Sequence, residues 1–191
     1  MDLGKLLEES GAIMRGHFLL ASGRHSDVYF EKFRVLEQPG VLSALCQEIA
    51  DHYRDKEIEL VAGPTTGGII IAFEVARQMG LPAVYVELEN GQRTLRRNKT
   101  IPQGAKTLIV DDVLTTGTSV LETAETIKQA GADVVALGVL IDRSAPDKQW
   151  PCPMFASYRV AAESYAPEDV PDWLQAIPLV KPGTRAKTLT P

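Results

Sequence analysis

The chain has 191 residues, of which 45% are hydrophobic and 24% charged, and its formal net charge is −5. These proportions are ordinary for one globular domain, and the length allows a buried core without disulfides or a structural metal. The acidic balance argues against a general nucleic-acid-binding protein, because such proteins concentrate basic residues. It also means that an anionic ligand would need a local cluster of cations.

The cysteines and the apolar runs bear on the cellular compartment. Cys46 and Cys152 form neither a disulfide framework nor a zinc-ligand spacing, as expected of a protein from a reducing compartment. The longest apolar runs, residues 69–73 and 134–141, are too short to span a membrane. The first ten residues are acidic and lack a signal-peptide core. We therefore expect a cytoplasmic protein that does not associate with membranes.

The first third of the chain predicts two helices and two short strands. Apolar spacing indicates helices over residues 2–10 and 39–53, and strand-like runs cover 17–20 and 28–33 around a Ser-Gly turn. The histidines are scattered along the sequence and suggest no metal site: His17, His25 and His52.

A strand over residues 58–62 runs into the loop GPTTGG, residues 63–68, and an apolar helix over 69–79. The start of a helix presents free backbone amides, which favour an anion. The loop matches neither a Walker motif nor GxGxxG, which argues against an ATPase or a dinucleotide-binding protein.

The next strand, residues 83–88, leads into a basic segment over 89–104. Asn90-Gly91 predicts a tight hairpin. Four cations follow within seven residues: Arg93, Arg96, Arg97 and Lys99. Two interpretations are open, a solvated charge-rich hairpin or a loop that contacts an anionic ligand.

The segment KTLIVDDVLTTGTSVLETA, residues 106–124, carries the strongest functional signal. A buried strand over 107–110 is followed by Asp111 and Asp112, a hydroxyl-rich loop over 115–119, and a helix that a glycine ends at Gly131. The loop therefore lies at the carboxyl end of a strand, where open α/β sheets bind ligands. Hydroxyls and amides suit a phosphate, and paired carboxylates suit the hydroxyls of a ribose. The alternative is that the two aspartates cap a turn.

A strand over residues 133–141 ends in Asp142-Arg143-Ser144, which places Arg143 at the same edge of the sheet. A guanidinium there could pair with a carboxylate of the ligand, or Asp142 and Arg143 could form a surface pair. The proline-rich end of the chain predicts an edge strand over 155–160 and a helix over 170–177 in which Trp173 packs inward. Residues 187–191 are expected to fray.

Alternating strands and helices predict an α/β fold with a doubly wound parallel sheet. The motif VDDVLTTGTS, residues 110–119, closely resembles the phosphoribosyl diphosphate signature of the type I phosphoribosyltransferases. Nearly the whole chain resembles the orotate phosphoribosyltransferase branch of that family. The resemblance implies one domain over residues 1–191, with a small hood formed mainly by 1–35 and the C-terminal segment.

The implied reaction transfers ribose 5-phosphate from phosphoribosyl diphosphate to N1 of orotate, giving orotidine 5′-phosphate and pyrophosphate in pyrimidine biosynthesis. Positioning and charge stabilisation would supply most of the acceleration. Mg²⁺ would be held mainly by substrate and water rather than by a protein cage. The resemblance also implies a homodimer, in which one subunit's hairpin completes the other's site.

The resemblance assigns roles by position. Asp111 and Asp112 would act in catalysis and hold the ribose hydroxyls. The 5-phosphate would bind the central loop: Thr115, Thr116, Gly117, Thr118 and Ser119. The diphosphate would bind the earlier loop: Thr65, Thr66, Gly67 and Gly68. The catalytic cations would come from the hairpin: Arg93, Arg96 and Lys99. Arg143, together with Thr115, would hold orotate.

The chain departs from its relatives in three places. Members of the branch often have a lysine where this chain has Ala21, an arginine where it has Leu88, and a glycine where it has Asn98. Two alternatives therefore stay open. The first is a phosphoribosyltransferase for another base, such as a purine, which has no carboxylate to pair with Arg143. The second is a regulator that binds phosphoribosyl diphosphate without turnover.

Overall fold

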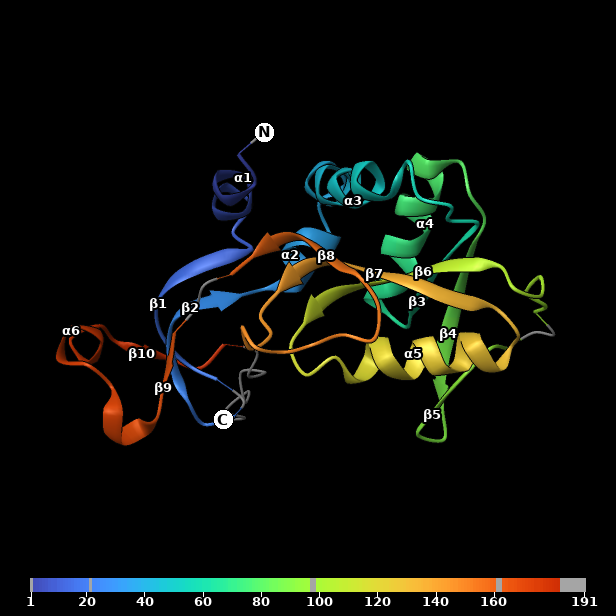
Figure 1. Ribbon diagram of the computed structural model, residues 1–191. Helices are drawn as coiled ribbons and strands as arrows, with labels where there is room; N and C mark the ends of the chain where they lie inside the picture. Colours follow the sequence, from blue (N-terminus) through green and yellow to red (C-terminus); the bar gives the residue numbers. More distant parts are fainter. Residues whose placement is uncertain (1, 21, 97–98, 161–162, 183–191) are drawn as a thin grey trace, which may run out of the picture.

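The computed structural model describes residues 2–20, 22–96, 99–160 and 163–182 and contains two β-sheets. The larger sheet lies to the right in Figure 1, and the smaller sheet lies beyond its left-hand end. Four features from the sequence analysis lie outside the described residues: the departures at Ala21 and Asn98, the cation Arg97 and the fraying of residues 187–191.

The larger sheet has six strands in the order β5-β4-β3-β6-β7-β8. Their bounds are β3 Leu60–Pro64, β4 Ala83–Glu89, β5 Gln92–Thr94, β6 Lys106–Leu114, β7 Asp133–Asp142 and β8 Met154–Arg159. All neighbours pair in parallel except β4 and β5, which form the predicted antiparallel hairpin. The predicted parallel sheet is confirmed, with β8 at its edge.

Helices cover both faces of this sheet. Helices α3, Pro39–Tyr53, and α4, Gly67–Met79, pack on one face, and α5, Thr118–Gln129, packs on the other (Figure 1). Each face has its own hydrophobic core, because the central strands are apolar on both sides. Cys46 is fully buried in α3, as its place in the apolar stripe indicates. The doubly wound arrangement is therefore confirmed.

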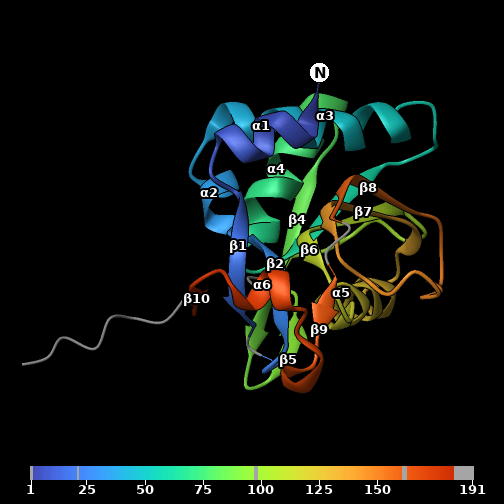
Figure 2. The same ribbon diagram turned by 90° about the vertical axis from the view of Figure 1, so that its left-hand side faces the viewer.

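The smaller sheet forms a hood from both ends of the chain. Its order is β10-β1-β2-β9, with β1 Ile13–Leu19, β2 His25–Phe30, β9 Ser164–Tyr165 and β10 Leu179–Val180. In Figure 2 this sheet faces the viewer. Helix α1, Leu3–Glu9, precedes β1, and the turn η1, Pro167–Asp169, and helix α6, Asp172–Gln175, lie between β9 and β10.

The prediction of a strand over residues 28–33 is partly wrong, because its last two residues begin helix α2, Lys32–Leu36. The Glu31 carboxylate accepts a hydrogen bond from the Phe33 backbone N–H at 3.3 Å and so caps this helix. The central strand was predicted to end at residue 110, but β6 continues to Leu114. Both aspartates of the motif therefore lie inside a strand.

The prediction that Trp173 packs inward is also wrong. Trp173 is 52% exposed, whereas its neighbour Leu174 is fully buried. Helix α6 spans only Asp172–Gln175, so it has a single inward position, and Leu174 occupies it. Sequence distance was also a poor guide for the histidines, because His17 and His25 lie side by side in the hood.

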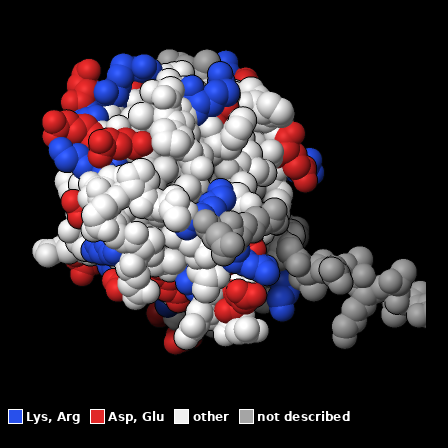
Figure 3. Space-filling view, turned by 90° about the vertical axis from the view of Figure 1, so that its right-hand side faces the viewer, with Lys and Arg blue, Asp and Glu red and all other residues white. Residues whose placement is uncertain are grey.

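None of the described helices is both long and apolar enough to cross a membrane. On the face shown in Figure 3, the described acidic and basic side chains are interspersed, and they form no continuous basic surface.

Candidate active site

Three loops meet at the carboxyl ends of neighbouring strands. Strand β6 pairs with β3 on one side and with β7 on the other. The loop after β3 therefore lies beside the loop after β6, which in turn lies beside the end of β7. The hood lies beyond these strand ends (Figure 1). Residues of the hood and of the strand ends together line two cavities at this edge, and we call this region the crevice. Parallel α/β sheets commonly bind ligands there.

Asp111 and Asp112 point to opposite faces of β6, as successive strand residues must. On the α5 side, Asp111 Oδ2 accepts a hydrogen bond from the Ser119 hydroxyl at 2.5 Å. On the α4 side, Asp112 Oδ2 accepts one from Lys32 Nζ at 3.0 Å. Asp111 is 6% exposed and Asp112 is 8% exposed. Each carboxylate has further lone pairs, which could accept hydrogen bonds from ligand hydroxyls.

The two carboxylates do not share the same electrostatic environment. Burial raises the pKa of Asp111, and the neighbouring Asp112 carboxylate raises it further, against the opposing hydrogen bond from Ser119. Asp112 faces a cation instead, because Lys32 lies within 3.0 Å of it. The crevice therefore contains one carboxylate neutralised by lysine and one whose ionisation is opposed by its surroundings.

Glycines bring the first loop close to the second. A Cβ on Gly67 would collide with the Asp112 carboxylate, and one on Gly68 would collide with the Pro64 ring. Residues with side chains would therefore push the start of α4 away from β6. Thr65 and Thr66 precede these glycines, joined by a cis peptide bond, and the Thr66 side chain is exposed. The predicted diphosphate-binding loop thus borders the twin aspartates.

The second loop exposes its hydroxyls and leads directly into a helix. Thr115, Thr116 and Thr118 are exposed, and Thr116 and Thr118 hydroxyl oxygens lie 3.1 Å apart. Gly117, with φ +82°, is the N-cap of α5, and no side chain caps this helix start. The first backbone amides of α5 are therefore available to an anion.

Trp150, from the loop between β7 and β8, packs against the buried Gly117. This tryptophan had no predicted role. Its contact restrains the turn at the helix start while the neighbouring threonines stay exposed. The hydroxyl-rich loop is therefore packed against Trp150 at Gly117, and its threonines are exposed to solvent.

Arg143 lies where β7 ends, as predicted. Its backbone N–H donates to the Leu114 carbonyl at 2.8 Å. Arg143 lines two cavities. One, of about 380 Å³, is also lined by Tyr29 and Lys32, and the other, of about 300 Å³, is also lined by Ser26 and Ser164 of the hood. Burial lowers the pKa of Arg143, although a guanidinium stays charged at physiological pH.

The alternative of a surface pair between Asp142 and Arg143 is wrong. Asp142 is fully buried, and its carboxylate accepts hydrogen bonds from the Ser144 backbone N–H and from Arg159. Burial tends to raise the pKa of Asp142, but the hydrogen bonds from Ser144 and Arg159 outweigh it and keep that pKa low. Asp142 thus anchors the turn, and its carboxylate does not pair with Arg143, which lines the two cavities.

The described cations of the hairpin segment, Arg93, Arg96 and Lys99, divide into two groups. The Arg93 guanidinium lies against the first loop, 3.3 Å from the Thr65 carbonyl oxygen. Arg96 pairs instead with Glu87 at 3.2 Å and Glu89 at 3.6 Å, both on β4. The Lys99 Nζ atom lies 4.5 Å from the centre of the ring of Tyr85, which is also on β4. The structure therefore brings Arg93 to the crevice loops and leaves Arg96 and Lys99 in contact with the hairpin strand.

Sequence reasoning missed Lys32, which reaches Asp112 although the two residues are 80 positions apart. It also missed Tyr29, which lies beside Arg143 in the same cavity. Neither residue belongs to a motif. The only local signal was that both residues lie in the strand-like run over residues 28–33.

Mg²⁺ prefers oxygen ligands and keeps several waters. Within the described part of the chain, no three His, Cys, Asp or Glu side chains form a group that could hold a metal ion. The twin aspartates offer carboxylate oxygens beside a loop suited to a diphosphate. These residues fit a magnesium ion that is bound chiefly through its substrate.

Comparisons with known proteins identify relatives of this chain. The model of the phosphoribosyl transferase domain matches residues 34–155. The orotate phosphoribosyltransferase of Desulforamulus reducens is 41% identical over 183 residues, which is 96% of each chain. That of Pelotomaculum thermopropionicum is 43% identical over 184 residues, covering 96% of this chain and 97% of the relative. The crystal structure of orotate phosphoribosyltransferase from Aeropyrum pernix superposes with a TM-score of 0.66 at 27% identity, covering 83% of this chain and 93% of that chain.

Proposed function

The chain belongs to the phosphoribosyl transferase family, in its orotate phosphoribosyltransferase branch. We propose that it catalyses, in the crevice, the transfer of ribose 5-phosphate from phosphoribosyl diphosphate to N1 of orotate. The products are orotidine 5′-phosphate and pyrophosphate. The observation that carries this proposal is the position of Arg143. Arg143 lines two cavities at the strand ends, one of them shared with Lys32, and the Asp142 carboxylate pairs with Arg159 instead.

The reaction breaks the bond between C1 of the ribose and the diphosphate, and N1 of orotate forms the new bond to C1. Positive charge develops on the sugar as the leaving group departs, so fixed charges and positioning lower the barrier. The hydroxyls of the second loop and the start of α5 hold the 5-phosphate. Asp111 and Asp112 accept hydrogen bonds from the ribose hydroxyls. The first loop and Arg93 hold the diphosphate.

Lys32 adds a positioning role to this scheme. Its ammonium group lies 3.0 Å from Asp112 and borders the same cavity as Arg143. It orients the Asp112 carboxylate, whose remaining lone pairs can accept a hydrogen bond from a ribose hydroxyl. Asp111 and Asp112 are the carboxylates that would help to hold Mg²⁺ bound with the substrate, and the ion would supply charge neutralisation on the diphosphate.

We also propose that the protein works as a homodimer in the cytoplasm. Ile70 and Phe73 lie one turn apart on α4 and are 42% and 65% exposed. Leu88 on β4, which packs against α4, is 57% exposed. Burying such apolar side chains favours association with a second copy. Both described cysteines are free thiols, which suits a reducing compartment. Neither nucleic acid nor a membrane is needed as a partner.

A product assay with phosphoribosyl diphosphate, Mg²⁺ and a panel of bases tests the function. We expect product with orotate and little with uracil, adenine or hypoxanthine. Arg143→Ala should lower kcat/KM for orotate by roughly 10- to 150-fold, because a hydrogen bond to a charged group contributes about 1.5–3 kcal/mol. Uracil lacks the carboxylate, so the same substitution should hardly change its already low rate.

Arg54→Ala is the matched control, because Arg54 is an exposed arginine at the end of α3 whose ion pair, among the described residues, is with Asp51. It should leave the rates unchanged. Product from adenine or hypoxanthine that survives Arg143→Ala would favour the purine alternative. Binding of phosphoribosyl diphosphate without product from any base would favour the non-catalytic regulator.

A further inference from the structure

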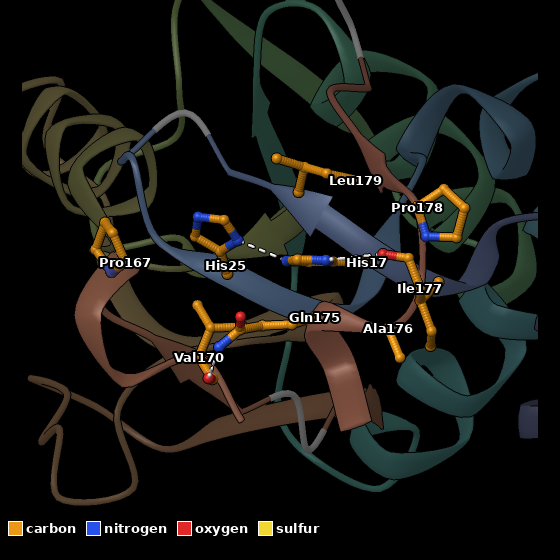
Figure 4. Close-up of a pocket in the computed structure, with 9 residues that line it drawn as sticks. All are labelled: His17, His25, Pro167, Val170, Gln175, Ala176, Ile177, Pro178 and Leu179. Carbon is orange, nitrogen blue, oxygen red and sulfur yellow. Dashed lines mark hydrogen bonds between the residues drawn. The ribbon is translucent and has the colours of Figure 1, made fainter. Parts of the chain in front are cut away.

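Two histidines of the hood form a pair that the proposed reaction does not use. His17 on β1 and His25 on β2 point toward one another, with His17 Nε2 and His25 Nδ1 2.6 Å apart (Figure 4). His17 is 5% exposed, and His25 is half-buried. The pair borders a cavity of about 450 Å³ between the hood sheet and the segment that contains Gln175 and Ile177. None of the residues around this cavity belongs to the candidate active site.

The hydrogen bonds determine which nitrogen carries each proton. His17 Nδ1 lies 3.1 Å from the carbonyl oxygen of Ile177. A carbonyl can only accept, so His17 carries its proton on Nδ1 and has a lone pair on Nε2. His25 Nδ1 then donates to that lone pair. A single proton therefore lies between two nitrogens that are both good metal ligands.

We propose that His17 Nε2 and His25 Nδ1 form a binding site for a divalent transition-metal ion, with Zn²⁺ as the reference ion. The His17 ring already has the form of a metal ligand, because its other nitrogen donates to a backbone carbonyl. Such a carbonyl partner fixes the tautomer and the ring orientation in metal sites. On binding, the His25 proton moves from Nδ1 to Nε2, so both rings stay neutral and both lone pairs meet the ion.

Geometry and ligand chemistry define what the site takes. With metal–nitrogen bonds of about 2.0–2.1 Å at a tetrahedral angle, the two nitrogens would lie about 3.3 Å apart. The rings must therefore separate by about 0.7 Å, and His25 can move because it is only half-buried. Imidazole selects zinc, copper and nickel over magnesium. The site is thus distinct in its ion from the magnesium of the proposed reaction.

The cavity supplies the remaining coordination positions. Gln175 lies beside the pair, and its amide nitrogen donates to the Val170 carbonyl at 2.7 Å (Figure 4). Its amide oxygen therefore remains as an acceptor. Water can fill the other positions, because a cavity of about 450 Å³ is far larger than one water molecule. A bound ion would link β1 and β2 through His17 and His25. Because His17 also donates to the Ile177 carbonyl, the ion would be connected to the segment between α6 and β10 as well.

Equilibrium dialysis against Zn²⁺ in excess Mg²⁺ tests the site. The reference protein carries His52→Gln and Cys152→Ser, which remove the third histidine and the partly exposed thiol. His17→Asn keeps a donor for the Ile177 carbonyl but lacks a nitrogen at the Nε2 position. His25→Gln lacks one at the Nδ1 position. Each should weaken binding of one Zn²⁺ per chain by at least tenfold, because even loss of an outer-shell partner costs 10- to 100-fold.

Zn²⁺ should also raise the thermal unfolding midpoint of the reference protein, and neither variant should show this rise. Circular dichroism of the metal-free variants checks their fold, and His25→Gln carries the test if His17→Asn does not fold. Equal Zn²⁺ binding by the reference protein and His25→Gln would overturn the proposal. So would no Zn²⁺ binding by the reference protein, which would leave a hydrogen-bonded histidine pair only.

Discussion

Alanine at Gly117 should destabilise the protein more than alanine at Gly91, although their φ angles are nearly equal at +82° and +80°. A Cβ on Gly91 would meet nothing within 4 Å, so only the left-handed backbone costs energy, roughly 1–2 kcal/mol. A Cβ on Gly117 would also collide with the six-membered ring of Trp150. Overpacking of this kind adds about 1–3 kcal/mol. The expected totals are thus about 1–2 and about 2–5 kcal/mol.

Urea unfolding at pH 7 measures both losses, and Trp150→Ala completes a double-mutant cycle. Without the Trp150 ring, Gly117→Ala should cost only the backbone contribution, so the coupling energy should be about 1–3 kcal/mol. Gly91→Ala should show no coupling to Trp150, because the hairpin turn does not touch it. Gly117→Ala should also weaken binding of phosphoribosyl diphosphate, since Gly117 is the N-cap of α5.

Two results would refute this reasoning. Equal losses at Gly117 and Gly91 would mean that the contact with Trp150 does not restrain the loop. An unchanged Gly117→Ala loss in the Trp150→Ala protein would mean that the cost is all in the backbone.

Three further predictions concern stability. Hydrogen bonds from Arg77 and other neighbours lower the pKa of Glu74 from 4.5 to about 2. The ionised carboxylate therefore contributes to the free energy of unfolding above pH 4.5, and this contribution is lost as the pH falls toward 2. Glu74→Gln should cost on the order of 1 kcal/mol in urea unfolding at pH 7 and little near pH 2. Asp111 has a raised pKa, so its ionisation opposes folding above that pKa; Asp111→Asn should raise the urea midpoint at pH 7 but not at pH 3, while product formation is lost. Leu174→Ala should cost about 2–5 kcal/mol by the same measurement, because Leu174 is fully buried; Trp173→Ala, at an exposed neighbour, should cost far less.

A failure of each would be informative. A pH-independent loss for Glu74→Gln would mean that its contribution is packing rather than charge. An unchanged or lowered midpoint for Asp111→Asn at pH 7 would mean that its neighbours stabilise the carboxylate more than burial opposes it. Equal losses at Leu174 and Trp173 would show that the exposed tryptophan is covered in solution.

Local patterns in the sequence predicted most of the fold. The order of strands and helices, the doubly wound sheet and the hairpin at Asn90-Gly91 all follow from apolar spacing and turn residues. Asn90 and Gly91 both adopt positive φ in the structure, as a two-residue hairpin turn demands. The predicted parallel sheet also implied that the loops after β3, β6 and β7 would lie at one edge, because the carboxyl ends of parallel strands share an edge.

Local patterns predicted less about the bounds of some elements. The two aspartates were expected after the central strand, since charged residues usually end a buried run. They lie inside β6 because Ser119 and Lys32 satisfy their carboxylates from two sides. Helix α6 was expected to pack through its largest side chain, but a helix of four residues can turn only one position inward, and Leu174 takes it.

Spacing along the chain was enough to predict most of the elements and the loops that carry hydroxyls, glycines and carboxylates. It could not predict that Lys32 faces Asp112, that Trp150 restrains Gly117 or that His17 meets His25, because these contacts join residues on different elements. Their geometry depends on how the sheet, helices and hood pack, and no periodicity along the chain records it.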